Sequence, residues 1–219
     1  MKSKNICFIP IKSRSTRVIS KNLRMLGDKP LFQYILDTVS TCNNFDRVIV
    51  DTDNQDIKDY CKTLDIEWME RDPKLAKDTA NGNDLLLNWH KQYPQYDYYY
   101  QLFATCPFTS KNTIDQCVEI LEGSNNNDSI FTSIYKCGWY WFDGKPINYN
   151  PKVLPRSQDA KQVVNETTAL YGISSVALDK LKCRIGNTPF FYFVSDREAI
   201  DIDSEFDFKI AQLALEDRL

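Results

Sequence analysis

The chain has 219 residues, a formal net charge of −3, and hydrophobic and charged fractions of 42% and 26%. These values are typical of a globular protein, so they exclude a disordered or fibrous chain and predict one domain over residues 1–219. The acidic balance argues against a nucleic-acid partner, which needs a basic face. No apolar run approaches the ~20 residues of a membrane span, so no membrane partner is expected either.

The cysteines and the N-terminal segment indicate the cellular compartment of the protein. The seven cysteines are odd in number, widely spaced and free of any CxxC pair, which makes a zinc site or a disulfide framework a weak interpretation. Charge resumes at Lys12 with no small-residue cleavage site after it, so the N-terminal apolar stretch is interpreted as a strand and not a signal peptide. We therefore expect reduced thiols in a cytoplasmic protein.

Strands and helices alternate along the first half of the chain. Residues 5–11 (NICFIPI) are a short apolar run typical of a strand buried on both faces. The same patterns predict strands at 47–51, 66–69 and 97–102, and helices at 31–39, 54–64 and 84–91. This alternation predicts an α/β fold with a mostly parallel sheet covered on both faces.

In the second half of the chain, the alternation of strands and helices is interrupted once. A helix capped by Ser110 and ended by Gly123 precedes a strand at 128–134. Residues 136–165, with Asp-Gly, three prolines and several aromatics, predict a hairpin excursion from the sheet. Strands at 170–176 and 190–194 and a helix at 204–215 complete the pattern, with Ser204 and Asp207 spaced as a capping box.

A basic loop follows the first strand. Lys12, Arg14, Arg17 and Lys21 crowd the carboxyl end of that strand, where open α/β sheets bind ligands. No glycine stands between residues 6 and 26, so neither a dinucleotide fingerprint nor a P-loop is present. The loop is either a solvated basic segment or a cradle for a polyphosphate, built from cations and backbone N–H groups.

Two carboxylates alternate in Asp201-Ile202-Asp203. On an extended segment both face one point, where two hard oxygen anions suit Mg²⁺. The alternative is that these acids only decorate the N-terminus of the last helix, which its dipole favours. Asp207, one turn later, is expected either to cap that helix or to support the two acids without binding the metal itself.

Three further segments are weak signals on their own. Arg71 follows a strand, and residues 78–83 offer small polar groups able to contact a base or ribose. Thr105 ends another strand, and Arg156 lies in the excursion.

Taken in order, the segments IPIKSRSTRVISKN, RVIVDTD, ERDPKLAKDTA, ATCPF, PRSQD and IDIDSEFDFKIAQLAL resemble the acylneuraminate cytidylyltransferases over roughly residues 5–215. The resemblance implies a three-layer, Rossmann-like nucleotidyltransferase fold in which residues 136–165 form a dimerisation arm. It also implies an enzyme that joins CTP to a 2-keto-3-deoxy sugar acid and releases pyrophosphate, with Mg²⁺ as cofactor and a homodimer as the assembly.

The resemblance assigns roles residue by residue. Catalysis falls to Lys21, Asp201 and Asp203, and the last two would also hold the metal. The residues expected at the nucleotide are Lys12, Arg17, Lys21, Asn22, Arg71, Asp78, Asn83 and Thr105.

On the sugar side the chain departs from the family. The residues expected there are Gln101, Phe103, Tyr171 and Arg156, the last reaching the neighbouring subunit's pocket. Phe103 stands where the family has a glutamine, and Gln101 lies two residues earlier on the same strand face. Thr109 replaces a family arginine. The acceptor is therefore left open among sialic acid, a legionaminate or pseudaminate type, and a shorter keto-deoxy acid. Two further alternatives are a nucleotidyltransferase for another sugar or nucleotide, and a catalytically silent sugar-binding protein.

Overall fold

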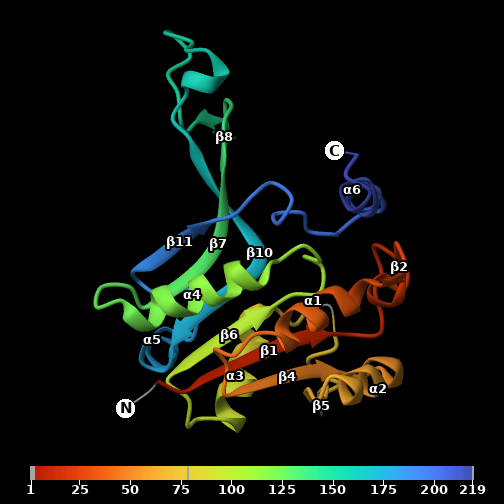
Figure 1. Cartoon of the computed structure of the whole chain (residues 1–219). Coiled ribbons are helices and arrows are strands. Elements are labelled where there is room, and N and C mark those ends of the chain that lie inside the picture. The colour runs from red at the N-terminus through yellow and green to blue at the C-terminus, as the bar shows by residue number, and fades with distance from the viewer. Residues whose placement is uncertain (1–2, 78, 219) are drawn as a thin grey trace.

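A seven-stranded sheet forms the centre of the computed structural model, which describes residues 3–77 and 79–218 (Figure 1). The strand order is β11-β7-β10-β6-β1-β4-β5. The strands are β1 (Asn5–Ile11), β4 (Arg47–Thr52), β5 (Glu67–Glu70), β6 (Tyr98–Leu102), β7 (Ser129–Lys136), β10 (Val163–Ser174) and β11 (Pro189–Phe193). β1 pairs in parallel with both β4 and β6, as the buried apolar runs predict.

Helices cover the two faces of the sheet. They are α1 (Leu31–Ser40), α2 (Gln55–Thr63), α3 (Gly82–Gln92), α4 (Lys111–Gly123), α5 (Ser175–Leu181) and α6 (Glu205–Leu215). Side chains alternate along β1: Cys7 and Ile9 pack with α1, α2 and α4, whereas Ile6 and Phe8 pack with α3 and α5. The expected three-layer α/β fold is confirmed.

The prediction for β10 was wrong in extent, and this strand is the antiparallel exception in a mostly parallel sheet. The strand runs over Val163–Ser174 instead of 170–176, and it is antiparallel to both β6 and β7. Its first half, VVNETT, lacks the apolar pattern of a buried strand because most of its residues are partly or fully exposed. Gly172 is required where β10 crosses β6, since an added Cβ would lie 2.6 Å from the Tyr100 ring. Residues 175 and 176, expected as the end of this strand, instead begin α5 (Ser175–Leu181), which Ser174 caps by accepting from Ala177 N.

Six short elements complete the described part of the fold. A small hairpin of β2 (Met25–Leu26) and β3 (Lys29–Pro30) precedes α1, and a 3-10 turn, η1 (Lys21–Leu23), lies just before it. The arm carries β8 (Trp141–Phe142), β9 (Lys145–Pro146) and the 3-10 turn η2 (Ser157–Asp159). Within the described residues no helix is long and apolar enough to cross a bilayer.

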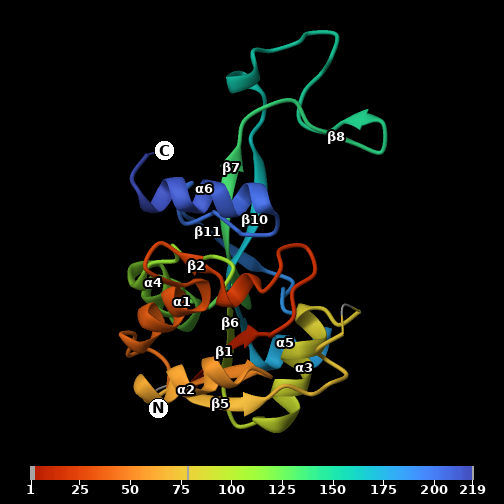
Figure 2. The ribbon, with the colours of Figure 1, turned by 90° about the vertical axis from the view of Figure 1, so that its right-hand side faces the viewer.

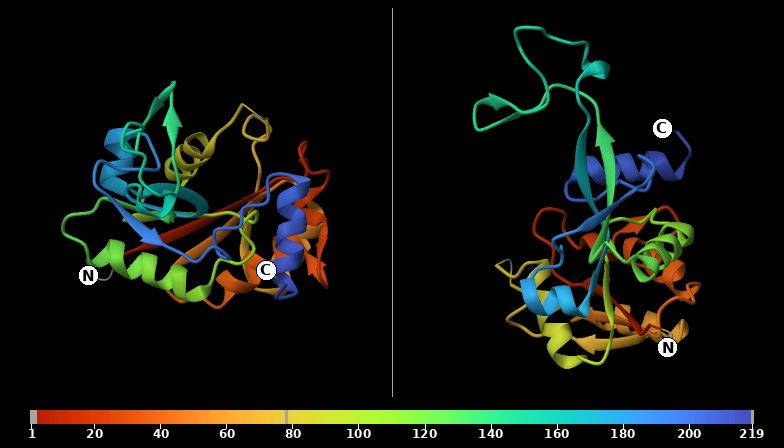
Figure 3. Two further views of the ribbon diagram at one scale, coloured as in Figure 1. Left: turned by 90° about the horizontal axis from the view of Figure 1, so that it is seen from above. Right: turned by 90° about the vertical axis from the view of Figure 1, so that its left-hand side faces the viewer.

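β7 and β10 continue beyond the sheet as a two-stranded stem that carries the arm (Figure 2). The arm rises past α6, at the opposite end of the molecule from the N-terminus (Figure 3). Buried Asn148 organises it: Nδ2 donates to the carbonyls of Gly138 and Lys161 at 2.7 Å, and Oδ1 accepts from Tyr140 N at 2.8 Å. The arm's large apolar side chains are exposed: Trp139, Trp141, Phe142, Ile147, Val153 and Leu154. Polar contacts, and not an apolar core, therefore fix its shape.

Candidate active site

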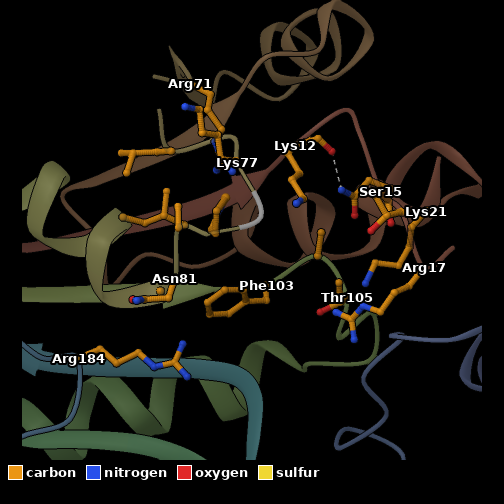
Figure 4. Close-up of a pocket in the computed structure, with 18 residues that line it drawn as sticks. Lys12, Ser15, Arg17, Lys21, Arg71, Lys77, Asn81, Phe103, Thr105 and Arg184 are labelled. Atoms are coloured by element: carbon orange, nitrogen blue, oxygen red, sulfur yellow. Dashed lines mark hydrogen bonds between the residues drawn. The ribbon is translucent and has the colours of Figure 1, made fainter. Parts of the chain in front are cut away.

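A pocket of about 540 Å³ opens at the carboxyl ends of β1, β5 and β6 (Figure 4). This is the edge where parallel strands present their loops to ligands. Seven of the residues predicted from the sequence line it: Lys12, Arg17, Lys21, Asn22, Arg71, Phe103 and Thr105. The fold therefore gathers residues that are up to 93 positions apart, Lys12 and Thr105, around one cavity.

At one end of the pocket, the basic loop is tied to the segment that carries the paired carboxylates. Lys21, 8% exposed, donates through Nζ to the carbonyl of Ile202 and lies 3.3 Å from Asp203 Oδ1. Arg17 Nη2 lies 2.8 Å from the same oxygen. The loop is closed on itself as well, because Asn22 Nδ2 donates to the carbonyl of Lys12 at 2.9 Å. We call this region the loop end.

Asp201 and Asp203 lie on the opposite side of their strand-like segment from Ile202. The Ile202 side chain is fully buried among apolar residues of the β2 and α6 region, and its N–H donates to the carbonyl of Thr105 at 2.9 Å. Asp201 Oδ2 accepts from the Thr168 hydroxyl at 2.6 Å. The other oxygen, Oδ1, is buried, and no residue the structure describes hydrogen-bonds to it. A buried carboxylate oxygen of this kind has its lone pairs available for a water molecule or a cation.

The capping box at α6 is confirmed. Ser204 Oγ accepts from Asp207 N, and Asp207 Oδ2 accepts from Ser204 N at 2.7 Å and from Asp203 N at 3.1 Å. Partial burial opposes ionisation, but these hydrogen bonds dominate and hold the pKa of Asp207 below its ordinary value. Asp207 therefore fixes the backbone that carries Asp203.

A buried ion pair forms the wall near β4 and β5. Arg71 Nε donates to Asp51 Oδ1 at 2.9 Å and Nη2 donates to the Asp51 carbonyl at 3.1 Å, with side-chain exposures of 4% and 2%. Trp89 Nε1 donates to Asp51 Oδ2 at 2.8 Å, and its ring stacks on Phe8. Arg71 thus lines the pocket with two of its guanidinium nitrogens, Nε and Nη2, already engaged.

Other predicted residues lie around the pocket and not on its lining. Gln101 is 1% exposed and uses Nε2 to donate to the carbonyl of Gly82 at 2.9 Å, which ties α3 to β6. Asn83 Oδ1 accepts from Arg184 N at 2.9 Å. Tyr171 is buried beneath Phe103, at 6.1 Å between ring centroids. Asp78 falls outside the described residues. Their roles stay predictions.

Arg156 lies in the arm, outside the pocket. Its exposed guanidinium pairs with Asp159 at 2.5 Å, three residues further along the chain. Its expected role in a neighbouring subunit's pocket stays a prediction.

Sequence reasoning missed Arg184, which lines the pocket together with Asn81, Gly82 and Lys77. Arg184 follows α5 in a loop, and its Cζ lies 3.6 Å from the centroid of the Tyr171 ring. Nη2 lies 3.3 Å from Glu166 Oε1, an atom that also accepts from the Tyr171 hydroxyl. The segment around Arg184 carries no local signal, since only the fold brings it to the start of α3. We call the region of Arg184, Tyr171 and Phe103 the aromatic end.

The donor set fits a magnesium ion that substrate phosphates help to hold. The described residues contain no group of three or more His, Cys, Asp or Glu arranged as a metal cage. Mg²⁺ commonly binds one or two carboxylates and completes its shell with phosphates and water. Asp201 Oδ1 is buried and unpartnered, and both cations on Asp203 contact the same oxygen, Oδ1.

Comparison with known proteins adds three kinds of match. A family model described as "Cytidylyltransferase" matches residues 6–175. N-acylneuraminate cytidylyltransferase A of Danio rerio is 23% identical over 96% of this chain and 51% of its own length. Post-translational flagellin modification protein B of Campylobacter coli is 23% identical over 99% of this chain and 97% of its own. The chain spans about half the length of the first of these relatives.

Solved structures show the same fold at low identity. A CMP:2-keto-3-deoxy-manno-octonic acid synthetase complexed with CTP has a TM-score of 0.72 at 14% identity, covering 99% of this chain and 100% of that one. A 4-diphosphocytidyl-2C-methyl-D-erythritol synthase of Anaerococcus prevotii has a TM-score of 0.68 at 14% identity, covering 97% and 96%.

Proposed function

The chain belongs to the cytidylyltransferase family, and from that premise we propose that it transfers a cytidylyl group from CTP to a 2-keto-3-deoxy sugar acid. The hydroxyl on the sugar's anomeric carbon forms a new bond to the α-phosphorus. The bond from that phosphorus to the β-phosphate oxygen breaks, pyrophosphate leaves, and the hydroxyl proton passes to solvent. The products are the CMP-sugar and pyrophosphate.

One observation carries the proposal. Lys21 joins the basic loop to the paired carboxylates through Ile202 and Asp203, in a pocket at the edge where α/β sheets bind nucleotides. Phosphoryl transfer of this kind needs positioning and charge neutralisation more than covalent catalysis. A buried ammonium beside the Asp203 carboxylate places opposite charges where a triphosphate and its cation would meet.

The nucleotide roles follow from charge and position. Lys12, Arg17 and Lys21 would bind the phosphates, with Asn22 fixing the loop through the Lys12 carbonyl. Arg17 is mostly exposed and pairs with Asp203 at the protein surface, so it can exchange that carboxylate for a phosphate. Arg71, Asp78, Asn83 and Thr105 are proposed at the nucleoside side.

Asp201 and Asp203 would hold Mg²⁺. Bound there, the ion would supply Lewis-acid charge to the α-phosphate and lower the pKa of the attacking hydroxyl. Thr168 fixes the orientation of Asp201 through its hydroxyl, and Asp207 fixes the backbone of Asp203.

The acceptor would occupy the aromatic end. Phe103 presents an apolar surface there and packs on Tyr171, while Gln101 would bind the acceptor after releasing the Gly82 carbonyl. Arg156 would reach the acceptor's carboxylate in a partner subunit, since a guanidinium binds a carboxylate bidentately.

The proposed assembly is a homodimer formed through the arm. Its exposed aromatic residues make up an apolar surface of the kind that a second copy covers. We place the reaction in the cytoplasm: the cysteines are scattered, and four of them, Cys7, Cys61, Cys106 and Cys117, are buried and unpaired.

The test is pyrophosphate release. Purified protein with Mg²⁺ is given CTP, UTP, ATP or GTP, and each nucleotide is combined with sialic, legionaminic, pseudaminic and eight-carbon keto-deoxy acids and with methylerythritol phosphate. We expect release with CTP and one class of sugar acid. Release with methylerythritol phosphate alone, or with another nucleotide, contradicts the proposal. CTP binding without release from any acceptor supports a silent binding protein instead.

A further inference from the structure

Arg184 is held rigidly at the aromatic end. Its backbone N–H is fixed by Asn83, its guanidinium lies over the Tyr171 ring, and Nη2 is tied to Glu166. The Phe103 ring is also close, with its centroid 6.0 Å from the guanidinium carbon. Holding an arginine from several sides reduces the entropy that a ligand contact would otherwise cost.

The guanidinium still faces the cavity. Arg184 is part of the pocket lining, with a side chain 22% exposed, and Figure 4 shows it entering on the side of Asn81. Nη1 lies over the backbone at the start of α3, where a Cβ on Gly82 would approach it to 2.6 Å. A glycine at this position therefore leaves room for the guanidinium.

Arg184 lies away from the reacting centre. Figure 4 places Arg17 and Lys21 on the far side of Phe103 and Thr105 from Arg184. In a 2-keto-3-deoxy acid, the carboxylate and the anomeric hydroxyl are on the same carbon, which must sit near Asp201 and Asp203 if the proposed function holds. Arg184 is therefore placed to contact substituents further along the sugar.

The charge at Arg184 is already balanced. Glu166 pairs with Nη2 of Arg184. A substrate carboxylate that approached the guanidinium would therefore also be repelled by the Glu166 carboxylate. A neutral oxygen gains a charge-assisted hydrogen bond without that repulsion. Among the polar groups of such acids, the carbonyl of an acylamino substituent is the strongest neutral acceptor.

We propose that Arg184 is a specificity-determining residue that donates a hydrogen bond to an acylamino carbonyl on the part of the acceptor remote from the reacting carbon. Among the acids that react, an acylamino group at that position is then preferred to a hydroxyl. This inference rests on the proposed function and assigns one residue to the choice of acceptor.

The experiment compares matched acids. For each nine-carbon acid that reacts, kcat/KM is measured for the acylamino form and for the counterpart with a hydroxyl in that position. The proteins are wild type, Arg184→Met, Arg184→Lys and Lys180→Met, an exposed control in α5. We expect wild type to prefer the acylamino acid roughly 10- to 100-fold, the range for a hydrogen bond from a charged donor. Arg184→Met should remove most of that preference, Arg184→Lys should restore part of it, and Lys180→Met should match wild type.

Binding of CTP, followed by its effect on the melting temperature, checks that each variant is folded. If a folded Arg184→Met protein still prefers the acylamino acid as strongly as wild type does, the inference is overturned and the proposed function stands. The inference is also overturned, and the proposed function still stands, if wild type turns over only the eight-carbon acid. Silence with every acid overturns the proposed function, and this inference falls with it.

Discussion

Both ends of the pocket pair basic side chains with a carboxylate, but the surroundings of the two pairings differ. At the loop end, Arg17 and Lys21 converge on one oxygen of Asp203, and the Arg17 and Asp203 side chains are 69% and 45% exposed. At the aromatic end, Arg184 and Glu166 are 22% and 39% exposed, and Tyr171 contacts both of them. The first pairing is open to water and the second is packed against a ring.

This difference separates two tasks. Exposed ion pairs contribute little to stability and exchange partners easily, as residues must when a charged ligand arrives. A guanidinium packed on an aromatic ring keeps one orientation, which suits the recognition of a shape. The loop end would therefore serve the reaction and the aromatic end would serve the choice of acceptor. Four substitutions test this division.

The largest effect is expected for Asp203→Asn at the loop end. The change removes a negative charge that would help to hold the metal and that Lys21 and Arg17 contact. We expect kcat to fall by roughly 10²–10⁴-fold, the range for losing one preorganised electrostatic group, while the protein folds normally. Steady-state pyrophosphate release measures it. Asp65→Asn makes the same chemical change at an exposed site and should leave kcat unaltered. A near-normal kcat for Asp203→Asn would remove Asp203 from the reaction.

How much of this site is visible in the sequence depends on how local its signals are. The loop end follows from short motifs: four cations in one loop and two acids in one extended segment. The parallel half of the sheet follows from apolar runs, because strands buried on both faces need them. At the aromatic end, Phe103 and Tyr171 follow from the family resemblance, but Arg184 has no local signal. Arg184 and Asn83 are 101 residues apart and meet only through β10, whose polar first half hides a strand of 12 residues.

The next effect tests the wall beside the loop end. Asp51→Asn leaves the Arg71 guanidinium buried without its counter-charge, although Trp89 can still donate to the amide oxygen. We expect the free energy of unfolding to fall by about 3–5 kcal/mol, the cost of breaking a buried pair by removing one partner. Urea denaturation measures this change, with Asp65→Asn as the matched control. If the free energy of unfolding falls by less than about 1 kcal/mol, water in the pocket must solvate the Arg71 guanidinium. This wall would then be as accessible to water as the loop end.

A smaller effect is expected for Gly82→Ala at the aromatic end. The new methyl would lie 2.6 Å from Arg184 Nη1, so the guanidinium must shift while its charge is kept. We expect kcat/KM for the acylamino acid to fall roughly 2- to 10-fold, within the range for weakening one hydrogen bond. The KM for the acid should change more than the KM for CTP. Gly123→Ala, whose methyl meets nothing within 4 Å, is the control. If only the KM for CTP changed, Gly82 would belong to the nucleotide side of the pocket.

The smallest effect concerns the cap that supports the loop end. Asp207→Ala removes the acceptor that fixes the backbone N–H groups of Asp203 and Ser204. Losing such a capping contact costs about 1 kcal/mol of stability at neutral pH. The pKa of Asp207 is lowered in the folded protein, so the carboxylate contributes fully above its unfolded pKa of about 3.9. This contribution is lost as the pH falls through the lower folded value. Denaturation of wild type and variant from pH 7 to pH 3 should give curves that stay apart above pH 4 and converge below it. A constant difference at every pH would show that the helix, and not the charge on Asp207, holds Asp203 in place.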